Sequence, residues 1–454
     1  MLNLLFSLYL LLLLLRPQEW IESLRAVPIL QVLLLACLAA WLFTGRKAWR
    51  LPQFPLLAWF LVATFASAVV AGWLGGLLVQ YNRLIPILLM LLVLVSVAQE
   101  LAMLRRLMKL MVFCACVMVL HGMLQLQTGV GWTGVAPAEG RITYAGIFDD
   151  PNDLGQLFVV CIAFCFYLRG SAGSGAKFLL LLLIGWLCYG VYLTNSRGTL
   201  LAVLAVFALL ALRRYGKVVM GVIAALVIPL LVVYTRFGQI SASEESASQR
   251  VDAWYAGFQM FRSDPLFGVG MGNFTDYNSS SLTAHNSLVL PIGELGLFGF
   301  LPWFGVVLLT GRMVYLMGTA QQRAARAAAA PDPGMIAVRG PALSFAGTAR
   351  ATKASGAAPA AALPAPSPEV LQEQEAGYGL MLAAAGFAVS CFFLSTSYKH
   401  MLFLVVALVM ARYVQARRVM PDLPELRFGQ ELPRVIGIGC AVVVLMWLVV
   451  KVLL

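Results

Sequence analysis

The chain of 454 residues is poor in charged residues and in histidine. Only 11% of its residues are charged and only 3 are histidines, whereas about 25% of the residues in a soluble domain are charged. This deficit excludes an ordinary water-soluble globular protein. Hydrophobic residues make up 61% of the sequence, and the mean hydropathy is +0.87. We therefore expect lipid to be the main solvent of the chain.

The sequence also lacks the cysteine and carboxylate patterns of a disulfide framework or a metal site. Its 8 cysteines all fall in apolar segments, and none has metal-ligand spacing with a histidine. We interpret them as small buried packing residues. Because no cluster of carboxylates suggests a bound cation either, we expect neither a metal nor a cofactor.

Long apolar runs are what the sequence has in abundance. Runs of about 20 residues recur along the chain, and each can cross the hydrocarbon core as a helix. They are continuous rather than alternating, which favours helices over a closed barrel. We predict an all-α fold, a polytopic integral membrane helical bundle of about 12–13 transmembrane helices. The first run, 2–15, lacks a basic start and a cleavage site, so we interpret it as a span and not as a signal peptide.

The composition divides the chain into five parts. Residues 319–375 are rich in Ala and Pro and cannot bury a core. Trp254 and Phe258 lie at helical spacing in a polar segment, which predicts an amphipathic helix. The predicted parts are an N-terminal transmembrane bundle of about nine spans (1–234), a periplasmic loop with the amphipathic helix (235–286), a broken transmembrane helix (287–318), a disordered cytoplasmic loop (319–375) and C-terminal transmembrane helices (376–454).

Basic residues predict the orientation of these helices. The formal net charge is +12, but we do not expect nucleic acid, because Lys and Arg gather in short loops between apolar runs. Every second loop is rich in them, and such loops remain in the cytoplasm. The loops 126–153, 194–198, 235–286 and 395–399 are then expected to face outward.

Three outward polar residues are candidates for function. Arg197 in "YLTNSRGTLLA" is surrounded by hydroxyl, amide and backbone donors at a helix start, which suits an anion; the alternative is an arginine reaching for headgroups. Arg250 in "SQRVDAW" could bind an anion or form a surface ion pair. His285 in "LTAHNSLVLPIG" could act as a proton acceptor or as a polar helix cap.

Further outward residues could line the same cavity. Arg83, Arg141 and Lys399 are possible cavity residues, while Asp150 in "DDPND" fits a helix N-cap. His121 lies within a predicted span, where we expect it to be packed and hydrogen-bonded. Nearly all the unexplained cations face one side, and few acids accompany them. A basic cavity beside lipid suits an anionic amphiphile such as a lipid-linked diphosphate.

Three motifs in order resemble a known family. "LTNSRGTLLA", "SQRVDAWYAGFQMFRSDPLFGVGMGNF" and "AHNSLVLPIGELGLFGFL" are similar to segments of the O-antigen ligase and O-antigen polymerase superfamily of bacterial membrane glycosyltransferases. The resemblance covers roughly Asp150 to Phe300. The N-terminal "LLLLLRPQEW" resembles a branch of O-glycosylation ligases associated with exosortase and exopolysaccharide systems.

The resemblance implies a location, a reaction and roles for three residues. The location is the bacterial inner membrane, with an active site that faces the periplasm. The reaction is a metal-independent transfer of a glycan from undecaprenyl diphosphate to an acceptor hydroxyl of lipid A-core, another glycan or a protein. Arg197 and Arg250 would hold the diphosphate, and His285 would deprotonate the acceptor. We expect inversion at the transferred sugar, because no carboxylate pair of glycosidase type is evident.

Several alternatives remain open at this stage. An O-antigen or exopolysaccharide polymerase and a protein O-oligosaccharyltransferase would share the donor chemistry and differ only in the acceptor. A transporter or flippase of lipid-linked sugars is an alternative of another class. It predicts charges through the whole depth of the membrane and internal repeats, and the sequence displays neither.

Overall fold

The computed structural model describes residues 1–238, 240–320 and 366–453, and within 217–247 it describes the backbone but few side chains. Every regular element in these residues is a helix, as predicted. The elements and their bounds are α1 (Leu2–Leu15), α2 (Pro17–Trp20), η1 (Glu22–Leu24), α3 (Ile29–Leu42), α4 (Gln53–Val70), α5 (Gly76–Val97), α6 (Leu101–Thr128), η2 (Gly146–Phe148), α7 (Pro151–Gly170), α8 (Ser174–Thr194), α9 (Arg197–Gly238), α10 (Ile240–Ser263), α11 (Phe274–Tyr277), α12 (Val289–Gly318), α14 (Pro368–Cys391), α15 (His400–Val419) and α16 (Phe428–Leu453).

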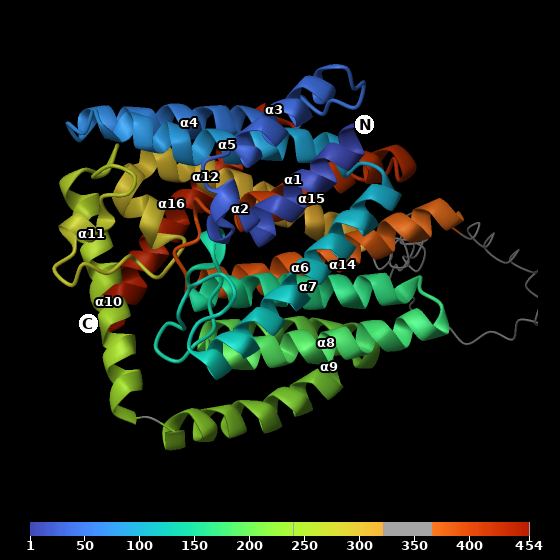
Figure 1. The fold of residues 1–454 in the computed structure, drawn as a ribbon. Coiled ribbons are helices and arrows are strands. Elements are labelled where there is room, and N and C mark those ends of the chain that lie inside the picture. Colours follow the sequence, from blue (N-terminus) through green and yellow to red (C-terminus); the bar gives the residue numbers. More distant parts are fainter. Residues whose placement is uncertain (239, 321–365, 454) are drawn as a thin grey trace, which may run out of the picture.

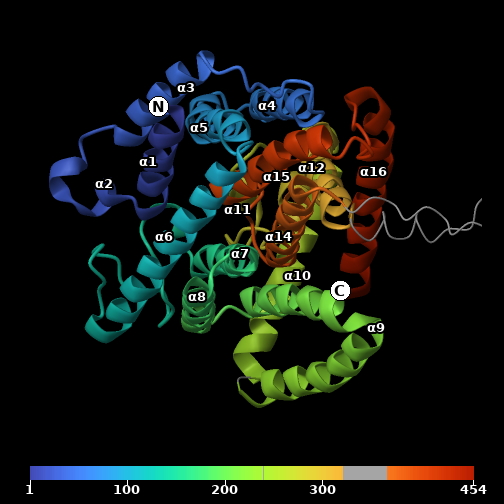
Figure 2. The ribbon, with the colours of Figure 1, turned by 90° about the vertical axis from the view of Figure 1, so that its right-hand side faces the viewer.

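The long helices lie side by side along a common direction (Figure 1). By length and composition, 8 helices of the described chain can cross a membrane. This count is lower than the predicted 12–13. The apolar helices α1 and α3 have only 14 residues each, about 21 Å, which is short for a hydrocarbon core of about 30 Å. The helices α14 and α15 also run through the bundle (Figure 2) but are not among the eight.

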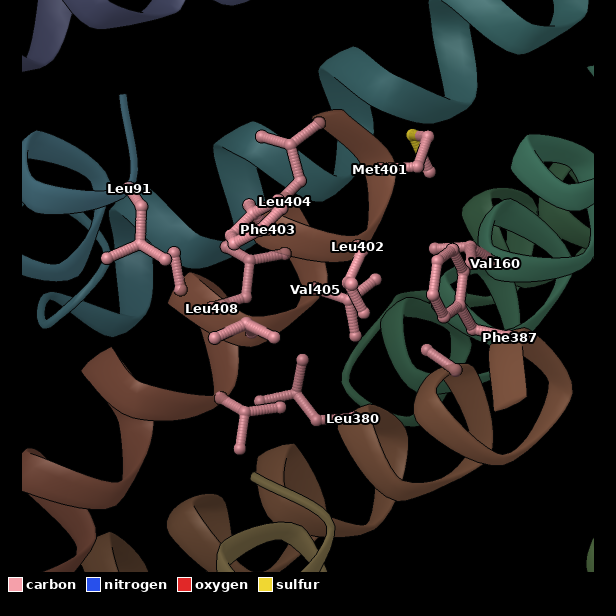
Figure 3. Packing of buried hydrophobic residues seen from close by; sticks show 14 of the residues in the cluster. Leu91, Val160, Leu380, Phe387, Met401, Leu402, Phe403, Leu404, Val405 and Leu408 are labelled. Atoms are coloured by element: carbon pink, nitrogen blue, oxygen red, sulfur yellow. The ribbon is translucent and has the colours of Figure 1, made fainter. Parts of the chain in front are cut away.

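The centre of the bundle is a continuous apolar core. Figure 3 shows Leu91 of α5, Val160 of α7, Leu380 and Phe387 of α14 and Val405 of α15 packed together. The helix α7 is the most enclosed candidate span, with 83% of its apolar window buried, whereas α8 is only 22% buried. A core around α7, α14 and α15 therefore fixes the ends of these three helices, and the loops at those ends build the site.

Two helices depart from straight spans. The helix α9 is kinked at Gly216, where φ is 79° and ψ is 179°. The predicted spans 199–212 and 218–234 both fall within it, and the side chains of the second lie almost wholly outside the described residues. The helix α12 is broken at Gly296, within the stretch where the Pro and Gly residues predict a broken helix.

Next in the chain, α10 runs across one end of the bundle instead of along it (Figure 1). It ends at Ser263, directly before Asp264-Pro265. It includes the segment in which the sequence predicts an amphipathic helix. The loop that contains α11 lies at the same end, and we call this end of the molecule the α10 end.

One predicted boundary is wrong. The helix α14 begins at Pro368, so residues 368–375, which we assigned to the disordered loop, are helical. Ser367 caps this helix by accepting a hydrogen bond from the Val370 amide at 3.4 Å, and Pro368 takes the first helical position, where its missing N–H costs nothing. Most of the predicted disordered segment, residues 321–365, lies outside the described residues.

Candidate active site

A polar cavity of about 300 Å³ opens at the α10 end of the bundle. Its lining comes from α5, α7, the loop before α12, α12 itself and the loop between α14 and α15. The ionisable residues that line it are Arg83, Asp150, Asp153, His285, Glu294, Tyr398 and Lys399. The cavity therefore brings together residues that are far apart in the sequence.

The backbone around His285 is held by its neighbours in sequence. His285 itself has a φ of 46°, a conformation that is uncommon for a residue other than glycine. Asn286 is fully buried, and its Oδ1 accepts hydrogen bonds from the amides of Leu288 and Val289 at 2.8 and 3.1 Å. Asn286 therefore satisfies the amides at the start of α12 in the manner of a cap, and His285 lines the cavity.

Ser287 fixes the same segment to the loop between α14 and α15. Its amide donates to the carbonyl of Cys391 at 3.0 Å, and its own carbonyl accepts from the Ser397 hydroxyl at 2.8 Å. The Thr396 amide donates to Ser287 Oγ at 3.0 Å. These bonds connect the segment that follows His285 to the loop that contains Tyr398 and Lys399.

Arg197 stands at the first position of α9. The helix α8 ends at Thr194, and Asn195 takes a left-handed conformation with φ 45°. Ser196 Oγ then accepts a hydrogen bond from the Thr199 amide at 3.3 Å, which is the chemistry of an N-cap. The guanidinium of Arg197 is exposed, beside the free amides at the start of a long helix.

Arg141 connects this turn to the start of α7. Its Nε donates to the Thr194 carbonyl at 2.8 Å, and its Nη2 donates to Asn152 Oδ1 at 2.8 Å. Asp150 Oδ1 accepts from the Asn152 amide at 2.7 Å, so the predicted N-cap of α7 is confirmed. Arg141 thus contacts neutral groups and keeps its positive charge uncompensated among the described residues.

Arg250 interacts electrostatically with the other cations and with His285. Burial lowers the pKa of Arg250, and the charges of Arg197 and Arg141 lower this pKa further. Burial also lowers the pKa of His285 below its usual 6.5, and the charge of Arg250 adds to this effect. Asp150 opposes this shift and Lys399 reinforces it. His285 is therefore neutral near pH 7, in the form that accepts a proton.

Lys399 and Arg83, two of the predicted cavity residues, both line the cavity. Lys399 forms an ion pair with the buried carboxylate of Asp153, so it is not the unpaired cation that the sequence suggested. Arg83 lies with its guanidinium carbon 6.0 Å from the ring centroid of Tyr398.

His121 lies away from the residues that line the cavity. It shares a 2.9 Å hydrogen bond with Thr133 Oγ1 and is fully buried, which confirms that it is packed.

Sequence reasoning missed Glu294 and Tyr398. Both line the cavity and both are 2% exposed. Glu294 carried a signal, because it is the only acidic residue between positions 287 and 317, and a charge within a membrane span is rare and commonly functional. With Asp150 and Asp153 it gives the cavity more acids than we expected. In the described ranges no three His, Cys, Asp or Glu side chains gather as potential metal ligands.

One comparison with known proteins bears on this geometry. Residues 157–304 match the family model described as O-antigen ligase, and no curated protein matches the chain. The matched segment contains Arg197, Arg250, His285 and Glu294. The family match implies an O-antigen ligase- or polymerase-type transfer of a lipid-linked glycan, and it does not identify the branch. The chain is a multi-pass membrane protein, and its residues 157–304 form a domain of the O-antigen ligase family.

Proposed function

We propose that this chain transfers a glycan from undecaprenyl diphosphate to an acceptor hydroxyl at the periplasmic face of the bacterial inner membrane. The observation that supports the proposal is the electrostatic neighbourhood of Arg250: the charges of Arg197 and Arg141 lower the pKa of Arg250, and the charge of Arg250 lowers the pKa of His285. A cation cluster and a neutral imidazole are the two groups that this reaction needs.

The cation cluster is suited to hold the diphosphate. Like charges held together repel one another, and an anion between them removes this cost. Neither Arg197 nor Arg250 has a carboxylate partner in the described part of the chain. Guanidinium groups bind phosphate oxygens through paired hydrogen bonds, and the start of α9 adds backbone amides. Arg197 and Arg250 would then stabilise the negative charge that develops on the leaving group.

The imidazole of His285 is suited to activate the acceptor. In the proposed step, the acceptor oxygen forms a bond to the anomeric carbon while the bond from that carbon to the diphosphate oxygen breaks. The electron pair of the broken bond leaves with undecaprenyl diphosphate, and the proton of the acceptor hydroxyl passes to His285. A single displacement of this kind inverts the anomeric centre, and a positioned base contributes roughly 10²–10⁴-fold to its rate.

The opposite end of the bundle supports the periplasmic assignment. At that end, basic residues that the sequence places on the cytoplasmic side form contacts with residues of other segments. Arg46 pairs with Glu100, Arg213 pairs with Glu375, and Arg105 donates to the Tyr167 hydroxyl at 3.3 Å. Because Lys and Arg are concentrated in cytoplasmic loops, the α10 end would face outward.

The decisive experiment uses the purified full chain in lipid vesicles with an undecaprenyl-diphosphate glycan. Three acceptors are offered separately: lipid A-core, a second lipid-linked glycan, and a peptide with Ser and Thr. We expect transfer to at least one acceptor, and the acceptor used distinguishes ligase, polymerase and protein O-oligosaccharyltransferase. Movement of the donor across the bilayer without transfer to any acceptor would contradict the proposal and favour a flippase.

A further inference from the structure

The cavity wall contains two buried polar side chains, Glu294 and Tyr398, that lie beside each other. Glu294 Oε2 and the Tyr398 hydroxyl form no hydrogen bond of regular geometry with the described residues, but the two side chains lie close enough to interact with each other. Burial raises the pKa of Tyr398, and the nearby charge of Glu294 raises it further, so the phenol keeps its proton and can donate. A buried polar group with an incomplete set of hydrogen bonds is costly, so a ligand that bonds to both side chains would be stabilised in this cavity.

Glu294 is held in place by its other polar atoms. Its Oε1 accepts from the Phe274 amide at 3.3 Å. Its carbonyl accepts from Ser67 Oγ at 3.0 Å and from the Gly270 amide at 2.9 Å. The fold therefore uses one carboxylate oxygen for the start of α11, and the second oxygen is left to Tyr398 and the cavity.

The charge of this subsite is unsuited to the diphosphate. Arg141, Arg197 and Arg250 do not line the cavity, within the part of the chain that the structure describes. The lining has three acidic residues, Asp150, Asp153 and Glu294, and two basic ones, Arg83 and Lys399, so it is not a cation cluster. A carboxyl group, a phenol and the Arg83 guanidinium together complement neutral hydroxyl groups, which donate and accept. A cavity of about 300 Å³ lies at the small end of the range for ligand sites, as a single sugar residue requires.

We propose, on the basis of the transferase function above, that Glu294, Tyr398 and Arg83 bind the sugar residue of the acceptor beside the hydroxyl that His285 activates. His285 lines this cavity too, so a sugar bound there presents a hydroxyl to the imidazole. Glu294 accepts hydrogen bonds from neighbouring hydroxyls, and Tyr398 donates one. The acceptor is accordingly a carbohydrate, not a Ser or Thr side chain of a protein.

The first test uses Tyr398→Phe, which removes only the hydroxyl. We expect the KM for the carbohydrate acceptor to rise by about 3- to 10-fold through the lost hydrogen bond, with the KM for the lipid-linked donor unchanged. The matched control is Tyr378→Phe. Its hydroxyl donates to the Leu209 carbonyl at 3.1 Å at the other end of the bundle, and we expect it to change neither KM.

The second test uses Glu294→Gln, which keeps an Oε1 acceptor for the Phe274 amide. We expect the acceptor kcat/KM to fall by about 10-fold, because one acceptor oxygen of the side chain is replaced by an NH2 donor, with donor KM and thermal midpoint maintained. Unchanged acceptor kinetics in both variants, an equal rise of both KM values, or transfer by the unsubstituted chain to the peptide alone would overturn the subsite. Absence of transfer to every acceptor by the unsubstituted chain would instead reject the proposed function, and the subsite with it.

Discussion

The two ends of the bundle use arginine differently. At the end opposite α10, Arg412 is fully buried and pairs with Glu373, and Arg312 pairs with Glu431. At the α10 end, Arg197 and Arg250 have no such partner among the described residues. A buried unpaired charge is strongly destabilising, so the first set has partners that support the fold. Arg197 is exposed and Arg250 is half-buried, and we infer that both bind an anion that the chain itself does not supply.

The largest expected effect tests the α10 end. His285→Ala should reduce the rate of glycan transfer by roughly 10²–10⁴-fold, because the acceptor loses its base. Donor binding should persist, since the diphosphate is held by Arg197 and Arg250. Single-turnover transfer and equilibrium binding of the labelled donor measure the two quantities separately. A His285→Ala protein that still transfers glycan at the normal rate would remove His285 from the mechanism.

The next effect tests the opposite end. Glu373→Ala leaves Arg412 buried without its partner, and this should reduce the free energy of unfolding by about 3–5 kcal/mol. Chemical denaturation in detergent micelles measures the loss. Because Glu373 lies outside the cavity, the protein that remains folded should transfer glycan at the usual rate. If activity per folded molecule declined as much as stability, the two ends would not be independent.

Arg197→Ala and Arg250→Ala should show the reverse pattern. Each removes charged hydrogen bonds to the donor, so we expect donor affinity to weaken by about 10- to 100-fold with little change in unfolding free energy. The control is Arg46→Ala, which breaks an exposed pair with Glu100 worth about 0–1 kcal/mol. Titration with the donor measures its affinity, and the thermal midpoint measures stability. Together they show whether the arginines at the α10 end affect binding more than stability. Strong destabilisation by the Arg197 or Arg250 change would indicate a structural role instead.

The smallest effect concerns pH. A base works when it is neutral, so transfer should decline as pH falls through the pKa of His285, which lies below 6.5. Asp150 raises this pKa and Arg250 lowers it. Asp150→Asn should therefore move the acidic limb of kcat/KM to lower pH, and Arg250→Gln should move it to higher pH. If the acidic limbs of the two variants shifted in the same direction, or did not shift, Asp150 and Arg250 would not be the groups that set the pKa of His285.

The sequence was sufficient where the chemistry is local. Continuous apolar runs predicted the helices, and the run "DDPND" predicted the cap that Asp150 provides. The turn at Arg197 was visible because Asn, Ser and Gly interrupt two apolar segments. Each of these features depends on neighbours within a few residues, so a pattern along the chain contains the information.

The rest of the site depends on contacts between distant segments. Lys399 and Asp153 are 246 residues apart in the chain, and no periodicity indicates that they pair. Ser287 binds a loop more than 100 residues later. Tyr398 lines the cavity because its loop is hydrogen-bonded to Ser287, just before the start of α12. The helical boundary at Pro368 was missed for a related reason, since Glu373 is stabilised by Arg412 on another helix.

Two glycines at the α10 end have a consequence for the evolution of this architecture. A Cβ at Gly268 would lie 2.4 Å from the backbone carbon of Glu294, and a Cβ at Gly296 would lie 2.5 Å from that of Leu266. Both also have positive φ, 68° and 56°. Main chain therefore touches main chain, and no alanine fits at either place. Homologues that preserve this arrangement should retain glycine at both positions, even where acceptor preference has diverged.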